Sequence, residues 1–118
     1  MSEIFSFTCY INPPTKNESK FLRNGRKFYP NPKYKKPWDE IQLQMHLVSK
    51  RNVMTKKNVI VSVWNGFKKI DIANFLSELE DRLQGIAYYN DRQIKEEHLY
   101  KLDDEDKEFF KVIVEEME

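Results

Sequence analysis

Residues 59–86 read VIVSVWNGFKKIDIANFLSELEDRLQGI, and this stretch decides the fold. Residues 59–64 are almost continuously apolar, which predicts a central strand that is covered on both faces. Asn65-Gly66 is a turn pair that ends this strand. The apolar residues that follow recur at helical spacing, and Gly85 supplies a stop, so an amphipathic helix is predicted to pack on the sheet. This helical stripe consists of Ile72, Phe75, Leu76, Leu79, Leu83 and Ile86.

The residues before this stretch predict two strands and a further helix. Residues 4–11 are rich in β-branched and aromatic residues and precede a Pro-Pro pair, so they predict a first strand. Residues 15–24 have turn composition, and residues 26–29 form a short second strand before further prolines end it. A helix is predicted over residues 38–50, because Pro37 suits a helix start. Its core-facing residues are Trp38, Ile41, Met45 and Val48.

The C-terminal residues complete the sheet. Residues 93–101 predict a strand, residues 103–108 a solvated acidic turn, and residues 109–114 a last strand. This order of elements predicts an α+β fold with a mixed, partly antiparallel sheet and two packed helices. Since no linker divides the chain, residues 1–118 are predicted to form a single domain.

Composition excludes several classes of protein. No apolar run approaches the roughly 18 residues that a membrane span needs, and the first residues lack the basic flank and cleavage site of a signal peptide. We therefore expect a cytoplasmic protein with no membrane contact. Cys9 is the only cysteine, which excludes an internal disulfide and a thiolate zinc cluster. Its apolar neighbours predict a buried residue without a chemical role.

The small net charge hides a strong asymmetry along the chain. Residues 1–70 carry 14 Lys/Arg against 4 Asp/Glu, a net +10, whereas residues 71–118 carry 6 against 15, a net −9. Most of the positive excess lies in residues 16–36, where eight basic residues face the single acid Glu18. Such a segment attracts a polyanion such as phosphate backbone; the alternative is a solvated loop that keeps the protein soluble. Aromatic residues that could stack on exposed bases, or face the core, are Phe21, Phe28, Tyr29 and Tyr34.

The helix that begins after Ile70 carries a polar face. Its polar residues at helical spacing are Asp71, Asn74, Glu78 and Asp81. Two alternatives stand at this point. Asp71 is either an N-terminal acid that the helix dipole favours, with a solvated stripe behind it, or part of a site with the later Asn90-Asp91 pair.

Four short motifs stand out: PPTKN at 13–17, DIAN at 71–74, DRL at 81–83 and NDRQI at 90–94. Together they resemble a known family, the RusA-type Holliday junction resolvases. The family opens a helix with Asp-x-Asp-Asn, and residues 71–74 read DIAN. An Asp-Ala-Leu segment of the family resembles residues 81–83, and its Asp-Asp-x-Gln-hydrophobic run resembles NDRQI at 90–94. The PPTKN turn at 13–17 is similar to the family's Pro-Pro-Ser/Thr-x-Asn turn, and the loop around Gly25-Arg26 resembles its basic region.

The resemblance implies a RusA-like fold and a dimeric, magnesium-dependent endodeoxyribonuclease that nicks four-way DNA junctions in recombination and repair. Asp71 and Asp91 match catalytic metal ligands, and the Asn90 carbonyl is a weak additional ligand for Mg²⁺, which prefers oxygen. We expect a homodimer, since two equivalent strands are cut. We expect a phage or prophage protein that acts in a bacterium or in a phage-infected host. The expected DNA-binding residues are Lys16, Arg23, Arg26, Lys27, Lys68 and Lys69.

Three positions depart from the family pattern. Ala73 replaces the second aspartate of the first pair, Ser77 replaces a lysine one turn later, and Asn90 replaces the first acid of the last pair. Each change removes a charge that would act on metal or phosphate. Residues that could compensate, or be ordinary surface groups, are Glu78, Asp81, Glu96 and His98.

Three functions follow as hypotheses. The first is a junction-resolving endonuclease whose site is degenerate, and it requires folding to bring Asp71 and Asp91 into one pocket. The second is a catalytically weakened or inactive junction-binding protein on the same scaffold. The third is a protein-interaction module in which the acidic second half contacts a partner protein.

Overall fold

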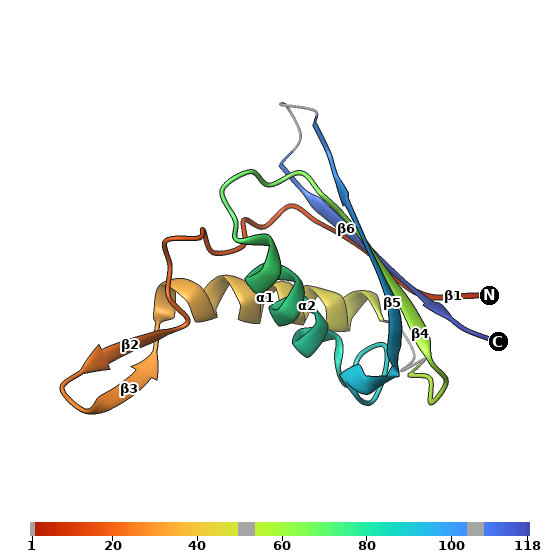
Figure 1. The fold of residues 1–118 in the computed structure, drawn as a ribbon, viewed down its shortest axis with the longest axis horizontal. Helices are drawn as coiled ribbons and strands as arrows, with labels where there is room; N and C mark the ends of the chain where they lie inside the picture. Colours follow the sequence, from red (N-terminus) through yellow and green to blue (C-terminus); the bar gives the residue numbers. More distant parts are fainter. Residues whose placement is uncertain (1, 50–53, 104–107) are drawn as a thin grey trace.

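A four-stranded sheet forms the main layer of the protein. The computed structural model describes residues 2–49, 54–103 and 108–118. The strand order is β1-β6-β4-β5, with β6 antiparallel to β1 and β4, and β5 parallel to β4 (Figure 1). This mixed sheet confirms the predicted α+β class. The strands are β1 (Ser2–Cys9), β4 (Val59–Asn65), β5 (Ile94–Lys101) and β6 (Phe110–Glu116).

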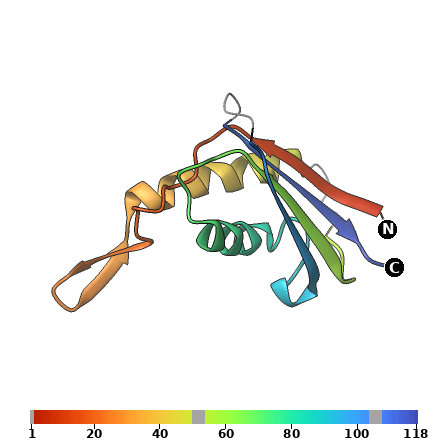
Figure 2. The same cartoon turned by 45° about the horizontal axis from the view of Figure 1, so that its top comes forward.

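Two helices pack on one face of this sheet, as Figures 1 and 2 show. They are α1 (Pro32–Val48) and α2 (Ile72–Leu83). The predicted apolar stripes face the sheet, since Trp38 and Ile41 of α1 and Leu79 and Leu83 of α2 are fully buried. Cys9 is buried in the same core, and burial raises the pKa of its thiol to about 11, as suits a residue without a chemical role. None of the described helices is long and apolar enough to cross a membrane.

The outer face of the sheet differs from the prediction. β4 is an interior strand, but the described helices cover only one of its faces (Figure 2). Ile60 points to the uncovered face and is nevertheless only 5% exposed. Its neighbours in register are Glu115 of β6 and Glu96 of β5, whose long side chains flank it. An apolar run therefore reflects burial by neighbouring strands here and not a second layer.

A hairpin precedes α1 and projects away from the sheet (Figures 1 and 2). Its strands are β2 (Phe21–Asn24) and β3 (Lys27–Pro30), joined by a turn at Gly25, whose φ of +64° suits glycine. The prediction of a short strand over residues 26–29 is confirmed. The assignment of residues 15–24 to a turn is wrong for β2, because an isolated hairpin has no buried face and so no alternation of apolar residues.

Helix α1 begins six residues before the predicted start. Asn31 caps it by accepting a hydrogen bond from the Lys33 N–H at 3.1 Å, and Pro32 occupies the first helical position, where proline is tolerated. Pro37 thus lies inside the helix and does not start it. The helix ends at Val48, and residue 50 of the predicted range lies outside the described residues, as do residues 104–107 of the predicted acidic turn.

Candidate functional site

Asp71 lies at the N-terminal end of α2, on the loop that leaves β4. Asn65 fixes this loop, since its side chain donates to the Phe67 carbonyl at 2.9 Å and accepts from the Phe67 N–H at 3.0 Å. Asp71 is the N-cap, and its Oδ1 accepts from the Asn74 N–H at 3.2 Å. The side chain is exposed, so one carboxylate oxygen caps the helix while the group stays accessible to a ligand.

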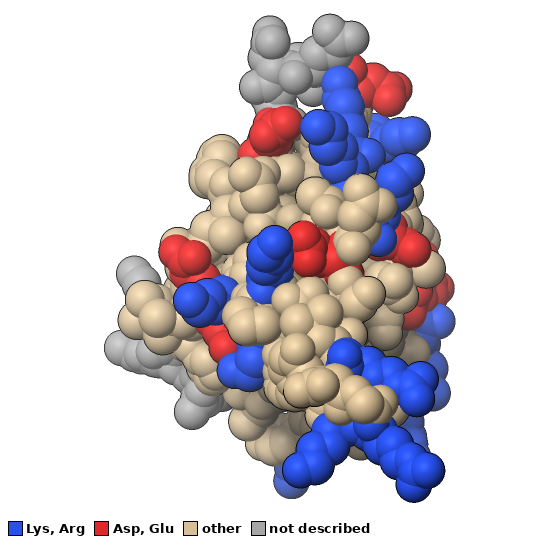
Figure 3. Space-filling view, turned by 90° about the vertical axis from the view of Figure 1, so that its left-hand side faces the viewer, with Lys and Arg blue, Asp and Glu red and all other residues tan. Residues whose placement is uncertain are grey.

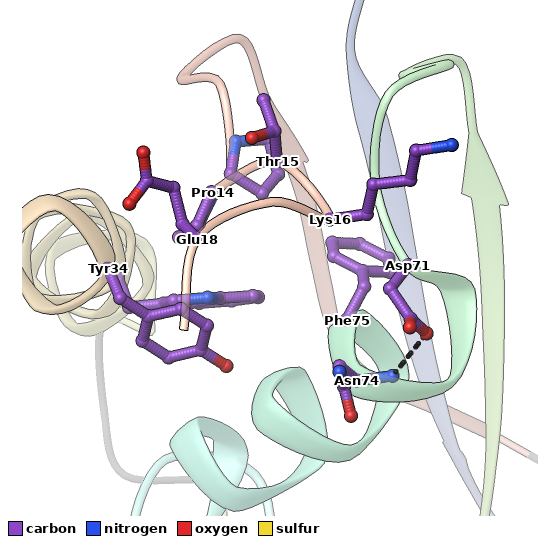
Figure 4. A pocket seen from close by; sticks show the side chains of 10 residues that line it. Pro14, Thr15, Lys16, Glu18, Tyr34, Asp71, Asn74 and Phe75 are labelled. Atoms are coloured by element: carbon purple, nitrogen blue, oxygen red, sulfur yellow. Dashed lines mark hydrogen bonds between the residues drawn. The ribbon is translucent and has the colours of Figure 1, made fainter. Parts of the chain in front are cut away.

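The turn at residues 13–17 meets this end of α2. The Lys16 N–H donates to the Lys69 carbonyl at 2.9 Å, which joins two segments that are far apart in the sequence. Figure 4 shows the groove that results, with Lys16 and Asp71 on one side and Tyr34 of α1 on the other. The groove is lined by Pro13, Pro14, Thr15, Lys16, Glu18, Tyr34, Trp38, Asp71, Asn74 and Phe75.

Three of the predicted DNA-binding lysines gather at this end of the molecule. Lys68 and Lys69 are exposed on the loop just before Asp71, and Lys16 is exposed on the adjoining turn. Lys68 and Lys69 also line a second groove, together with Asn12 and Glu108. Cations on both sides of an exposed acid form a surface on which a phosphate can lie beside a carboxylate.

Asp91 lies beyond the opposite end of the same helix. It starts a short 3-10 helix, η1 (Asp91–Gln93), and its backbone N–H donates to Oε1 of Gln84, the C-cap of α2, at 3.0 Å. The 12 residues of α2 extend about 18 Å. Metal-bound carboxylate oxygens lie about 2.1 Å from Mg²⁺, so one chain does not bring Asp71 and Asp91 into one pocket. Among the described residues, no three acidic, histidine or cysteine side chains lie together as a metal site.

Asn90 and Gln93 have structural roles beside Asp91. The side-chain amide oxygen of Asn90, Oδ1, accepts from the Arg92 N–H at 2.9 Å, so the predicted weak metal ligand caps η1. Gln93 accepts from the N–H groups of Tyr89 and Asn90 and donates to the carbonyls of Thr55 and Lys57. This part of the motif therefore fixes the loop that presents Asp91, which the sequence alone did not indicate.

Glu78 is a buried member of an ion-pair network and is not available as a ligand. It is 5% exposed and pairs with Lys20 at 3.1 Å and Arg82 at 2.9 Å. Burial by itself raises the pKa of this carboxyl, but hydrogen bonds from Arg82 and Lys20 outweigh it, and the net shift is downward. Tyr34 donates to Glu78 and Arg82 also binds Asp39, so the network ties α1 and the residues before the hairpin to α2. The i,i+4 spacing of Glu78 and Arg82 is the signal for it in the sequence.

The other acids that could compensate are dispersed. Asp81 is exposed and lines a separate, adjoining groove with Asn74 and Ser77. Glu96 pairs with His98 at 3.2 Å on the outer face of β5, away from α2. Glu80, on α2, faces Glu97 of β5: burial and the hydrogen bond and repulsion between the two carboxyls, with the charge of Asp91 adding to it, raise the pKa of Glu80 to about 8.

The remaining predicted DNA-binding residues lie on the hairpin. Arg23 is in β2, Lys27 is in β3, and Arg26 is in the turn between them. Figure 3 shows basic side chains at the lower end of the molecule, where the hairpin lies, and again at the upper end, with acidic side chains between them. The six predicted DNA-binding residues thus fall into two groups, three on the hairpin and three on the segments next to Asp71.

A known family model matches most of this chain. The family model described as Endodeoxyribonuclease RusA matches residues 11–115, which includes the turn at 13–17, the hairpin, α2 and η1. No curated protein matched the chain. Membership in this family implies Holliday junction resolvase activity on branched DNA. Because the match covers nearly the whole chain, the protein belongs to the RusA endodeoxyribonuclease family.

Proposed function

We propose that the protein is a Mg²⁺-dependent endonuclease that nicks four-way DNA junctions in recombination and repair, and that it works as a homodimer. The observation that carries this proposal is the groove at the N-terminal end of α2, where Asp71 is exposed beside Lys16 and Lys69 in a chain of this family. The lysines hold phosphates of the strand to be cut. The hairpin residues Arg23, Arg26 and Lys27 hold a neighbouring arm of the junction.

The separation of the two acids determines how a metal site can form. Because α2 separates Asp71 from Asp91, the described residues of one chain do not fit a Mg²⁺ ion held by both. Two chains related by a two-fold axis across α2 would lay these helices antiparallel. Asp71 of one chain would then lie beside Asp91 of the partner, and two equivalent sites would form, as a paired cut requires.

Each side chain of such a shared site has a defined task. Mg²⁺ bound by these carboxylates would polarise the scissile phosphate and lower the pKa of a bound water. Asp71 stays oriented because it caps α2, and Asp91 stays oriented because Gln84 and Gln93 fix its loop. Lys16 and the lysines at 68 and 69 neutralise the negative charge that the carboxylates and the phosphate bring together.

Cleavage of a synthetic four-way junction tests this function. Wild type should nick the junction in the presence of Mg²⁺ and leave the matched duplex intact. Asp71→Asn and Asp91→Asn should each lose cleavage but still bind the junction, whereas Glu96→Gln, an exposed acid on the outer face of β5 and away from α2, should retain cleavage. Equal cleavage by the Asp71→Asn variant and wild type would contradict the proposal.

A second candidate function rests on the residues that depart from the family pattern. Ala73 and Ser77 are exposed on α2, and Asn90 is engaged in capping, so the charges that the family has at these three places are absent. A protein of this kind would bind junctions in a salt-dependent manner without cutting them. Ala73→Asp distinguishes the two functions: a large gain of cleavage from an inactive wild type would identify a junction-binding protein with a degraded site.

A further inference from the structure

The β2–β3 hairpin is an arm with two different faces. In an antiparallel pair, residues opposite each other point to the same face and successive pairs alternate. Phe21 opposite Pro30 and Arg23 opposite Phe28 therefore share one face. Leu22 opposite Tyr29 and Asn24 opposite Lys27 share the other. The first face carries two phenyl rings and a guanidinium on a hairpin that projects from the body of the protein (Figure 2).

The base of this arm is fixed to the domain by Asn31, which is 4% exposed. The Asn31 N–H donates to the Lys20 carbonyl at 3.1 Å, and its side-chain amide donates to the Ser19 carbonyl at 2.8 Å. The same side chain caps α1 through the Lys33 N–H. Both ends of the hairpin are thus tied to one buried residue at a helix terminus, and the arm is held in a defined direction.

The rings of the first face are largely exposed, and Phe21 also lines a pocket with Pro30, Tyr34 and Arg82. Phe28 is 68% exposed and Phe21 is 52% exposed, and neither belongs to the hydrophobic core. The Arg23 guanidinium lies 5.8 Å from the centre of the Phe28 ring, which leaves much of the ring uncovered. Exposed rings on one face of a projecting element are typical of a binding surface.

The charge around these rings indicates the chemistry of the partner. Residues 21–30 contain three basic residues and no acid. Arg23, Arg26 and Lys27 form no ion pair with a described acid, whereas the single nearby acid, Glu18, is within hydrogen-bonding distance of Asn31. An apolar protein partner would leave three cations uncompensated. Nucleic acid compensates them with phosphates and offers base faces to the rings.

We propose that the Phe21–Arg23–Phe28 face of the hairpin stacks on unstacked bases at the branch point of a DNA junction. This inference rests on the proposed function for its substrate, and it assigns a new role to the rings. In a fully paired duplex the bases are stacked on one another, and only the cations of the arm find a partner. The rings therefore provide preference for branched DNA, and the cations provide affinity for any DNA.

Binding measured by fluorescence anisotropy in Ca²⁺ without Mg²⁺ tests this assignment, using a four-way junction and a fully paired duplex of matched sequence. Stacking of one base on an aromatic side chain changes affinity by roughly 5- to 150-fold. Phe28→Ala should therefore weaken junction binding at least about five-fold and duplex binding less than about two-fold. Phe28→Trp should retain the preference. In wild type, 2-aminopurine at the branch point should change its fluorescence on binding, and in Phe28→Ala this change should be lost.

Two variants serve as controls. Tyr29→Ala removes a ring that is 44% exposed on the opposite face, and it should leave the ratio of junction to duplex affinity unchanged. Arg26→Ala removes a charge from the turn and should weaken binding to both DNAs by the same factor. Equal losses on junction and duplex for Phe28→Ala would overturn the stacking role. A lower molar mass of Phe28→Ala than of wild type, measured by light scattering, would also overturn it, because the face would then be an interface between copies of the chain.

Failure of this inference is distinguishable from failure of the proposed function. If wild type prefers junctions through Phe28 but never nicks them in Mg²⁺, the stacking role is supported and the proposed nuclease function is contradicted. If wild type nicks junctions and Phe28→Ala prefers junction over duplex as strongly as wild type does, the nuclease function is supported and the stacking role is contradicted. A wild type that binds neither DNA at low salt contradicts both.

Discussion

Asp71 and Asp91 lie at the two ends of one helix: the first caps the start of α2, and the second donates its backbone N–H to Gln84, the residue that ends it. The sequence motif contains both acids, but the fold of one chain holds their side chains apart. If both hold one metal ion, two copies of the chain must contribute to each site.

Replacement of Asp71 separates its two roles. Asparagine caps a helix as well as aspartate does, so Asp71→Asn should change the free energy of unfolding by less than about 0.5 kcal/mol, whereas Asp71→Ala should lower it by about 1 kcal/mol. Junction cleavage should fall at least about 100-fold in both variants, because the carboxylate is lost. Urea denaturation and a cleavage assay measure the two effects. A cleavage loss that simply follows the stability loss would assign Asp71 to the helix cap alone.

The buried network around Glu78 should contribute strongly to stability. Arg82→Ala leaves the Glu78 carboxylate buried with Lys20 as its remaining ion-pair partner, so the free energy of unfolding should fall by about 2–4 kcal/mol. Lys35→Ala is the matched control, since it breaks only an exposed pair with Asp39 and should cost less than about 1 kcal/mol. Equal effects of the two variants in urea denaturation would show that the network is not buried in solution.

The Glu80–Glu97 pair should make stability depend on pH. The pKa of Glu80 is raised from 4.5 to about 8 by burial and by Glu97, so the folded state holds this proton more tightly than the unfolded state. The stabilising contribution is complete below pH 4.5 and is lost as the pH rises through about 8. Because the site is partly solvated, we expect a loss on the order of 1–2 kcal/mol between pH 5 and 9.

Glu80→Gln should abolish most of this decline, because an amide does not titrate and can donate to Glu97. Glu96→Gln, on the opposite face of β5, is the control and should leave the pH dependence as in wild type. Urea denaturation across this pH range measures the effect. A wild-type stability that rises from pH 5 to pH 9 would contradict the assignment.

The sequence predicts the elements that contribute to the core better than those that do not. Strand β4 and helix α2 have strong apolar patterns, because β4 is buried along nearly its whole length and α2 buries one side against the sheet. Strand β2 lies in an exposed hairpin, where nothing imposes such a pattern, and it was predicted as a turn. The start of α1 was missed because Pro32 can occupy the first helical position as well as break a strand.

The candidate site, too, could be predicted only in part. The lysines at 68 and 69 and Asp71 are neighbours in the sequence, so their proximity is local, whereas the position of Lys16 beside them depends on one backbone hydrogen bond. The expected pocket between Asp71 and Asp91 conflicts with a rigid helix between them, whose predicted length already implies their separation. The roles of Tyr34 and Gln93 depend on contacts across the fold that no spacing indicates.

The most direct test of the shared metal site is complementation between two inactive variants. Asp71→Asn and Asp91→Asn, unfolded together and refolded to exchange subunits, would form mixed dimers in which one site has lost both acids and the other is intact. Each variant alone should not nick a four-way junction in Mg²⁺, and the mixture should regain about a quarter of the wild-type sites. A mixture as inactive as either variant alone would contradict a site built from two chains.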